Sequence, residues 1–133
     1  MMENPFVVVD SDILIDVSRG ISQAIHELEN LEKINALSIS VITELELMVG
    51  CENKKEFREL KIFLERFEVL HLSEAISLKA VELFNKFRLS HDVKIADMLI
   101  ASTALVYDVE LISKNQKDFK FIDELNLIQY LAK

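Results

Sequence analysis

Phe6-Val7-Val8-Val9-Asp10-Ser11-Asp12 is the stretch of the chain that decides the fold. Its apolar run predicts a short strand that is buried on both faces, because the run does not alternate with polar residues. The polar residues that follow end the strand and suit the start of a helix. Strands with two buried faces occur in parallel sheets that helices cover. This stretch therefore predicts a central parallel strand that leads into a helix.

The rest of the chain repeats this order of strand and helix. Apolar runs predict further strands at residues 36–39, 68–72, 110–113 and 125–128. Apolar residues at helical spacing predict helices at residues 13–17, 21–31, 41–49, 54–66, 74–89 and 93–106. Strands that alternate with helices through right-handed crossovers predict an α/β protein, a three-layer α/β/α sandwich with a central, mainly parallel sheet.

Polar residues and glycines mark the expected helix ends. Ser40, Ser73 and Asp92 each precede a predicted helix, and their side chains suit the N-cap position. Gly20 is expected to close the first short helix. Gly50 follows the predicted helix at 41–49, and we expect it to end that helix with a positive φ.

The composition predicts a single domain, residues 1–133. Half of the 133 residues are apolar, and only two Gly and one Pro occur, so no linker can be placed. Cys51 is the single cysteine, and residues 1–10 lack the basic and apolar regions of a secretion signal. The apolar stretch at residues 98–107 is shorter than the ~20 residues of a membrane helix. We therefore expect a cytoplasmic protein with no membrane partner.

Acidic and amide side chains follow several of the predicted strands. In open parallel sheets, ligands bind at the carboxyl ends of the strands, so residues at those positions are candidates for chemistry. Glu44 and Glu46 face roughly 200° apart on one predicted helix, so only one can point at the site, and we expect Glu44 to face solvent. The candidates at this edge are Asp10, Asp12, Glu44, Glu46, Asp97, Asn115 and Asp118.

The surroundings of these acids point to a bound cation. Asp10, Glu46 and Asp97 each lie within apolar sequence, and ionised carboxylates brought together at low dielectric repel one another unless cations hold them. Oxygen ligands favour Mg²⁺ or Mn²⁺, whereas Zn²⁺ favours Cys and His, of which the chain has one and three. Carboxylates that hold such ions are a usual means of activating water for phosphodiester hydrolysis.

Each acid also has a purely structural interpretation, which the sequence leaves open. Asp10 with Asp12 suits a helix N-cap, and Asp118 suits a turn. Asp97 suits the first turn of a helix, where an acid complements the helix dipole. The net charge of −8 argues against nucleic-acid binding through overall charge and leaves that task to local cations.

Four segments of the chain, in this order, resemble the motifs of the PIN-domain family and, within it, of the VapC-type ribonuclease toxins. The segments are residues 7–15, 39–50, 96–101 and 111–119. In the second motif the acid lies four residues before the glycine, which selects Glu46. The chain departs from the family at Ser11 and Asp12, where the family often has Thr and Asn.

The resemblance implies a metal-dependent endoribonuclease that cleaves RNA phosphodiester bonds, as the toxin of a type II toxin-antitoxin pair. It implies Mg²⁺ or Mn²⁺ as the cofactor, an RNA substrate, a cognate antitoxin protein and a homodimer. The implied catalytic residues and metal ligands are Asp10, Glu46, Asp97 and Asp118, with Asn115 as the alternative to Asp118. Candidate contacts to RNA or to a partner are Ser11, Asp12, Arg19, Lys94, Lys114 and Lys117.

Other functions fit parts of the sequence. The main alternative is a catalytically inactive PIN-like binding module, in which the acids serve packing or hold a partner's cations. A phospho-acceptor receiver domain also has paired acids after its first strand, but residues 68–73 offer no acceptor Asp. A phosphatase of the haloacid dehalogenase type shares the Asp10-Ser11-Asp12 spacing, but 133 residues leave little room for its cap domain or long core.

Overall fold

The core of the molecule is a parallel sheet of five strands. A computed structural model describes residues 6–130. The strands lie in the order β3-β2-β1-β4-β5, and every neighbouring pair is parallel. The strands are β1 (Phe6–Val9), β2 (Ala36–Ser40), β3 (Glu68–Leu70), β4 (Glu110–Ile112) and β5 (Leu127–Ile128). The predicted central place of the first strand is thereby confirmed.

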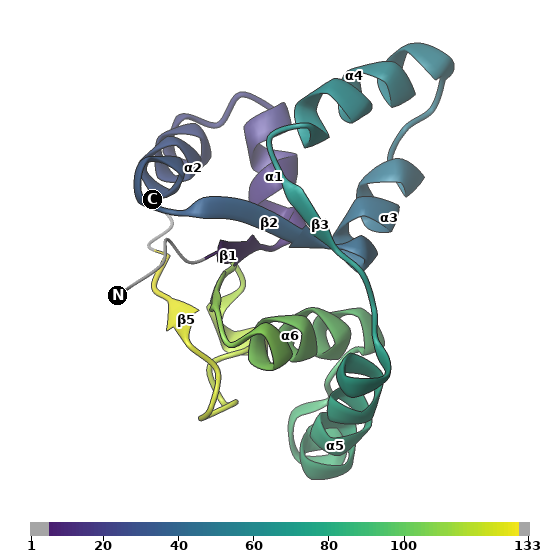
Figure 1. Cartoon of the computed structure of the whole chain (residues 1–133), viewed down its shortest axis with the longest axis vertical. Coiled ribbons are helices and arrows are strands. Elements are labelled where there is room, and N and C mark those ends of the chain that lie inside the picture. Colours follow the sequence, from purple (N-terminus) through teal and green to yellow (C-terminus); the bar gives the residue numbers. More distant parts are fainter. Residues whose placement is uncertain (1–5, 131–133) are drawn as a thin grey trace.

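Helices cover both faces of this sheet (Figure 1). They are α1 (Ser11–Ser18), α2 (Ser22–Ile34), α3 (Val41–Val49), α4 (Lys54–Leu64), α5 (Glu74–His91) and α6 (Ile95–Tyr107), with a short 3-10 helix, η1 (Gln116–Asp118). In Figure 1, α1 and α2 lie on one side of the sheet and α5 and α6 on the other. The predicted three-layer α/β/α sandwich is confirmed. Within residues 6–130, no helix combines the length and apolar character needed to cross a membrane.

The apolar residues of β1 contribute to the hydrophobic cores on both faces of the sheet. Successive side chains of a strand point to opposite sides, so Val7 and Val9 join one hydrophobic core while Val8 joins the other. The first core includes Ile13 of α1, and the second includes Met98 of α6. All three valines are 0% exposed, which explains why this strand has no polar alternation.

Three of the expected helix ends are formed as predicted. The Ser40 hydroxyl accepts a hydrogen bond from the Ile42 N–H at 3.0 Å, and the Ser73 hydroxyl accepts one from the Ile76 N–H at 3.2 Å. Both serines therefore satisfy N–H groups at the beginning of a helix, which have no partner within it. Gly20 has a φ of +77° and forms the turn that closes α1, as its freedom from a Cβ allows.

Two other expected helix ends are wrong. Asp92 does not begin a helix: it ends α5 in the left-handed conformation, with φ 50°, and α6 begins only at Ile95. Asp tolerates this conformation better than most residues, and an ion pair with Arg88 at 3.3 Å holds its side chain back on α5. Gly50 has a φ of −76°, so α3 ends without a left-handed residue. Its N–H instead donates to the carbonyl of Leu47 in a tightened last turn.

Candidate active site

The candidate site lies at the carboxyl end of the sheet, where β1 and β4 end side by side. Val9 is in register with Ile112, and the N–H of Asp10 donates to the Ile112 carbonyl at 3.0 Å. The residue that follows each of these strands is buried: Asp10 after β1 and Ser113 after β4. Pairing of the two strands therefore brings together residues from opposite ends of the sequence.

Asp10 is the most buried acid of the site, at 6% exposure. Its Oδ1 accepts from the Ser11 N–H at 2.8 Å, and its Oδ2 accepts from the Ser113 hydroxyl at 2.8 Å. Burial, followed by the negative charge of Asp12, raises the pKa of Asp10 to about 7 in spite of these two donors. The capping contact to Ser11 is present, so Asp10 serves as the N-cap of α1 and also presents a carboxylate at the edge of the sheet.

Asp97 lies in the first turn of α6 and is half-buried. Burial, and after it the negative charge of Asp118, raises the pKa of Asp97 to about 6. The charge of Glu46 acts in the same direction, and the positive charge of Lys94 opposes it. The negative charges of acids on both α3 and η1 therefore act on the pKa of Asp97, and Asp97 acts on that of Asp10. The four predicted acids thus share one electrostatic environment.

Glu46, rather than Glu44, faces this environment. Its Oε1 accepts a hydrogen bond from the Ser11 hydroxyl at 2.9 Å, which ties α3 to the beginning of α1. Of the two glutamates, Glu46 is the one that contacts the residue next to Asp10. Glu44 is half-buried, so the expectation that it faces solvent is wrong.

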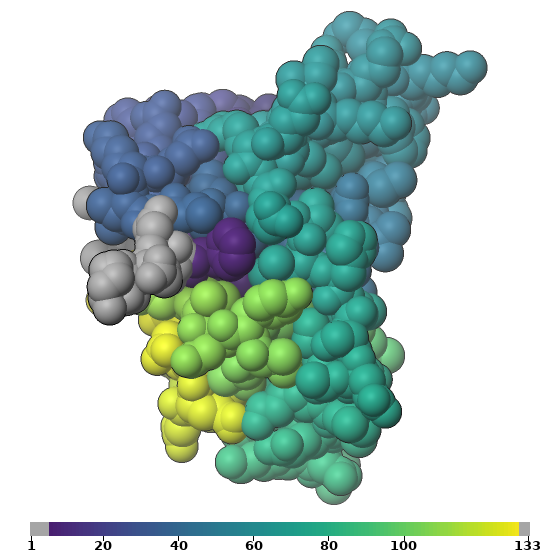
Figure 2. Space-filling model, in the orientation of Figure 1, coloured from purple at the N-terminus to yellow at the C-terminus, as the bar shows by residue number. Residues whose placement is uncertain are grey.

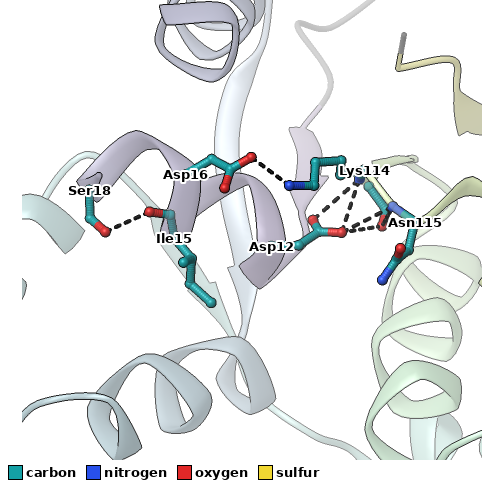
Figure 3. A network of polar contacts seen from close by, with 7 residues as sticks. Asp12, Ile15, Asp16, Ser18, Lys114 and Asn115 are labelled. Carbon is teal, nitrogen blue, oxygen red and sulfur yellow. Dashed lines mark hydrogen bonds and ion pairs between the residues drawn. The ribbon is translucent and has the colours of Figure 1, made fainter. Parts of the chain in front are cut away.

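Asp12 points toward the loop that follows β4. Its carboxylate accepts from the N–H groups of Lys114 at 3.1 Å and Asn115 at 3.0 Å, and lies 3.2 Å from the Ser113 hydroxyl oxygen (Figure 3). Four residues further along α1, Asp16 pairs with the Lys114 ammonium at 2.8 Å (Figure 3). The side chains of Asp12 and Lys114 therefore both make polar contacts within the protein.

The remaining predicted residues lie around this centre. Asp118 is half-buried at the end of η1, while Asn115 is exposed and its backbone N–H is held by Asp12 and by the Ser113 hydroxyl at 3.1 Å. The candidate cations Arg19, Lys94 and Lys117 are exposed. Of these three, only Lys94 affects the pKa of a site acid.

Ser113 lies among the site residues although its sequence position did not single it out. It is 0% exposed, and its hydroxyl contacts both Asp10 and Asp12. A signal for it was present, because Ser113 directly follows β4 just as Asp10 directly follows β1. Without the pairing of these two strands, however, nothing in the sequence joins the two residues.

The positive charge of Lys94 acts on Asp97 without forming an ion pair with it. Among residues 6–130, no ion pair involves Asp10, Glu46, Asp97 or Asp118. In the same part of the chain, no three His, Cys, Asp or Glu side chains already form a group that could hold a metal ion. The donor set nevertheless fits a hard divalent cation, because it offers only oxygen atoms and because burial, with neighbouring negative charges after it, raises the pKa of Asp10 and Asp97. Glu46 is the exposed member, with the most freedom to rotate toward such an ion.

An open groove of about 630 Å³ adjoins Glu46 and lies between α1, α3 and α4. Its apolar lining residues are Leu14, Ile15, Leu47, Leu60 and Phe63. Charged side chains from the same helices also line it, namely Arg19, Glu46, Glu56 and Glu59. Helix α4, one wall of the groove, stands out from the upper part of the molecule (Figure 2).

Known proteins share both the sequence pattern and the fold. The family model described as "PIN domain" matches residues 7–125. Ribonuclease VapC10 of Mycobacterium tuberculosis is 35% identical over 120 residues, which cover 90% of each chain. A toxin-antitoxin complex from Klebsiella pneumoniae contains a chain that is 30% identical, with a TM-score of 0.78 over 92% of this chain and 96% of that one. VapBC2 from Rickettsia felis, bound to a DNA fragment from their promoter, gives 27% identity and a TM-score of 0.83 over 94% and 98%.

The fold and the site define a class of protein, an α/β/α domain that gathers acids at the carboxyl end of a parallel sheet. With the matches in sequence, the chain belongs to the PIN-domain family and, within it, to the VapC type.

Proposed function

We propose that this protein is a metal-dependent endoribonuclease that cleaves RNA phosphodiester bonds, and that it is the toxin of a type II toxin-antitoxin pair. The observation that carries the proposal is the shared environment of four acids, in which the pKa of Asp10 rises to about 7 and that of Asp97 to about 6. Such a cluster is costly to a folded protein, and function is the usual reason for keeping it. The relative named Ribonuclease VapC10 supports the reaction class.

The proposed metal ligands are Asp10, Glu46, Asp97 and Asp118, with Asn115 as the alternative to Asp118. Mg²⁺ or Mn²⁺ held there would neutralise the acids, activate water and stabilise charge on the phosphate. Asp10 and Asp97 must lose their protons before they can bind a cation, and their raised pKa values make this loss incomplete below neutral pH. Ser113 orients the Asp10 carboxylate, and Ser11 orients that of Glu46.

Local cations are proposed to hold the RNA, because the net charge of −8 repels it. Lys94, Lys117 and Arg19 are exposed and available for phosphate contacts. Lys114 would have to release Asp16 first, and Asp12 already accepts hydrogen bonds from the loop after β4. We therefore assign the RNA contacts to Lys94, Lys117 and Arg19.

The proposed partners are a cognate antitoxin and a second copy of the chain. The groove beside Glu46 is lined by apolar side chains and by three glutamates with Arg19, which suits an amphipathic antitoxin segment with basic side chains. A basic side chain from that segment would neutralise the site acids and compete with the metal ion. For the homodimer, α5 and α6 offer exposed apolar side chains, namely Leu78, Val81, Leu89 and Ile95.

Two further properties belong to this proposal. The two hydrophobic cores include residues of one and the same sheet, which supports a single domain over residues 1–133. Cys51 is a free thiol, and together with an RNA substrate it favours a place in the reducing cytoplasm.

The test is cleavage of a mixed, structured RNA pool by the purified protein in Mn²⁺ or Mg²⁺, with EDTA and with the Asp97→Asn variant as controls. We expect cleavage that requires the metal and is lost in the variant. Failure of the folded, antitoxin-free, metal-loaded protein to cleave any RNA in the pool would contradict the proposal. A protein that also fails to bind Mn²⁺ would instead be the catalytically inactive binding module.

A further inference from the structure

Asp12 lies among the site acids, but its carboxylate contacts the loop that follows β4. Its Oδ2 lies 3.1 Å from the Lys114 N, 3.0 Å from the Asn115 N and 3.2 Å from the Ser113 hydroxyl oxygen. Its Oδ1 lies 3.3 Å from the same Lys114 N. A carboxylate surrounded by donors in this way acts as the anchor of a turn.

The anchored turn leads directly into the element that carries Asp118. The N–H of Asp118 donates to the Asn115 carbonyl at 3.1 Å, so η1 is built on the residue that Asp12 holds. Asp118 in turn acts on the pKa of Asp97, which places it beside the α6 side of the site. A continuous chain of contacts therefore runs from α1 through residues 113–115 to the fourth acid.

The far end of the same loop has its own anchor. The side-chain amide of Gln116 donates to the Ser113 carbonyl at 2.7 Å and to the Ile128 carbonyl of β5 at 3.1 Å. This contact fixes the loop to the sheet edge, whereas among residues 6–130 it is Asp12 that fixes the loop's backbone N–H groups to the beginning of α1. Loss of Asp12 would remove the acceptor of the Lys114 N–H and one of the two acceptors of the Asn115 N–H.

We propose that Asp12 is a positioning residue, whose carboxylate anchors the turn at residues 113–115 and thereby sets the place of Asp118 beside Asp97. It is not one of the metal ligands. The inference rests on the proposed function only in assigning Asp118 to the site, because the anchoring itself is a property of the metal-free chain. An amide can replace the carboxylate at the turn, since its oxygen, in the place of Oδ2, can accept from the N–H groups of Lys114 and Asn115.

The test compares three variants of the full-length protein, Asp12→Asn, Asp12→Ala and Asp16→Asn. Asp16→Asn is the matched control, because it removes the same charge from the same helix and frees the Lys114 side chain but leaves the turn intact. The first measurement is amide hydrogen exchange of residues 113–118 in EDTA. The second is cleavage of the structured RNA pool as a function of Mn²⁺ concentration.

We expect Asp12→Ala to speed exchange at the Lys114 amide by about tenfold or more, because its acceptor is lost, and to speed exchange less at the Asn115 amide, which keeps the Ser113 hydroxyl as an acceptor. We expect its cleavage to fall by about 10- to 100-fold, the usual loss when a group that supports metal ligands is removed. Asp12→Asn should stay within about threefold of the unmodified protein in both measurements, and so should Asp16→Asn.

Two results would overturn the inference. One is an Asp12→Asn variant that is as inactive as Asp10→Asn while its loop amides exchange at the normal rate, since Asp12 would then act through its charge. The other is an Asp12→Ala variant with normal exchange at Lys114 and Asn115. If the unmodified protein cleaves no RNA, the proposed function fails, while the exchange measurement still decides whether Asp12 anchors the turn.

Discussion

The hydroxyl of Ser113 donates a 2.8 Å hydrogen bond to Oδ2 of Asp10, across 103 positions of sequence. Both residues directly follow strands of the sheet, and both are buried. The bond lowers the pKa of Asp10, while burial and the charge of Asp12 raise it. Ser113 therefore influences how much of the site acid is ionised at neutral pH, and the first prediction concerns this serine.

Replacement of Ser113 by Ala should raise the pKa of Asp10 further, because the donor that favours the ionised form is lost. The acidic limb of the pH profile of RNA cleavage should then move to higher pH by about one unit. Ser113→Thr keeps the hydroxyl and is the control, which should leave the limb in place. Equal profiles for the Ala variant and the unmodified protein would show that this bond does not control the ionisation of Asp10.

Replacement of Asp10 by Asn should abolish cleavage, with a loss of at least about a hundredfold, because a neutral amide binds a divalent cation poorly. The same change should stabilise the metal-free protein at about pH 8, where it removes a buried charge. Cleavage assays and urea unfolding in EDTA measure the two effects. Asp123→Asn removes an exposed charge and should change neither property by much.

The metal-free protein should lose stability as pH rises from about 4 to about 7. In the unfolded chain Asp10 has its ordinary pKa of 3.8, whereas in the folded protein its pKa is about 7. The folded state therefore binds more protons between these values, and stability falls by up to about 1.4 kcal/mol per pH unit for each such group. Asp97 adds to the fall up to its own pKa of about 6.

Urea unfolding in EDTA across this pH range measures that fall. Comparison with Asp10→Asn isolates the contribution of Asp10, because the variant should show a flatter profile up to about pH 7. Parallel profiles for the two proteins would contradict the assignment of a raised pKa to Asp10.

Glu46 and Glu44 offer a matched pair for metal binding. Glu46→Gln should weaken Mn²⁺ binding by about tenfold or more, because Glu46 shares the environment of Asp97. Glu44→Gln changes the same charge on the same helix and should leave the affinity nearly unchanged. Calorimetric titration with Mn²⁺ measures both, and a greater loss for Glu44→Gln would reverse the assignment.

Local sequence was enough to predict the architecture. The run Val7-Val8-Val9 shows a strand with two buried faces, and the alternation of strands and helices along the chain requires parallel crossovers. The carboxyl ends of parallel strands meet at one edge, so the residues that follow β1 and β4 could be placed at the same edge of the sheet without coordinates. These inferences succeed because periodicity and strand direction depend on residues close together in the chain.

Tertiary structure alone decided how the acids of that edge differ. Asp10 is buried with a raised pKa, whereas Asp12, two residues away, is turned toward the loop after β4. Nor did the sequence show that Asp92 ends a helix or that Gly50 ends one without a positive φ. Burial and hydrogen-bond partners depend on segments about a hundred positions apart, and only the pairing of β1 with β4 brings those segments into contact.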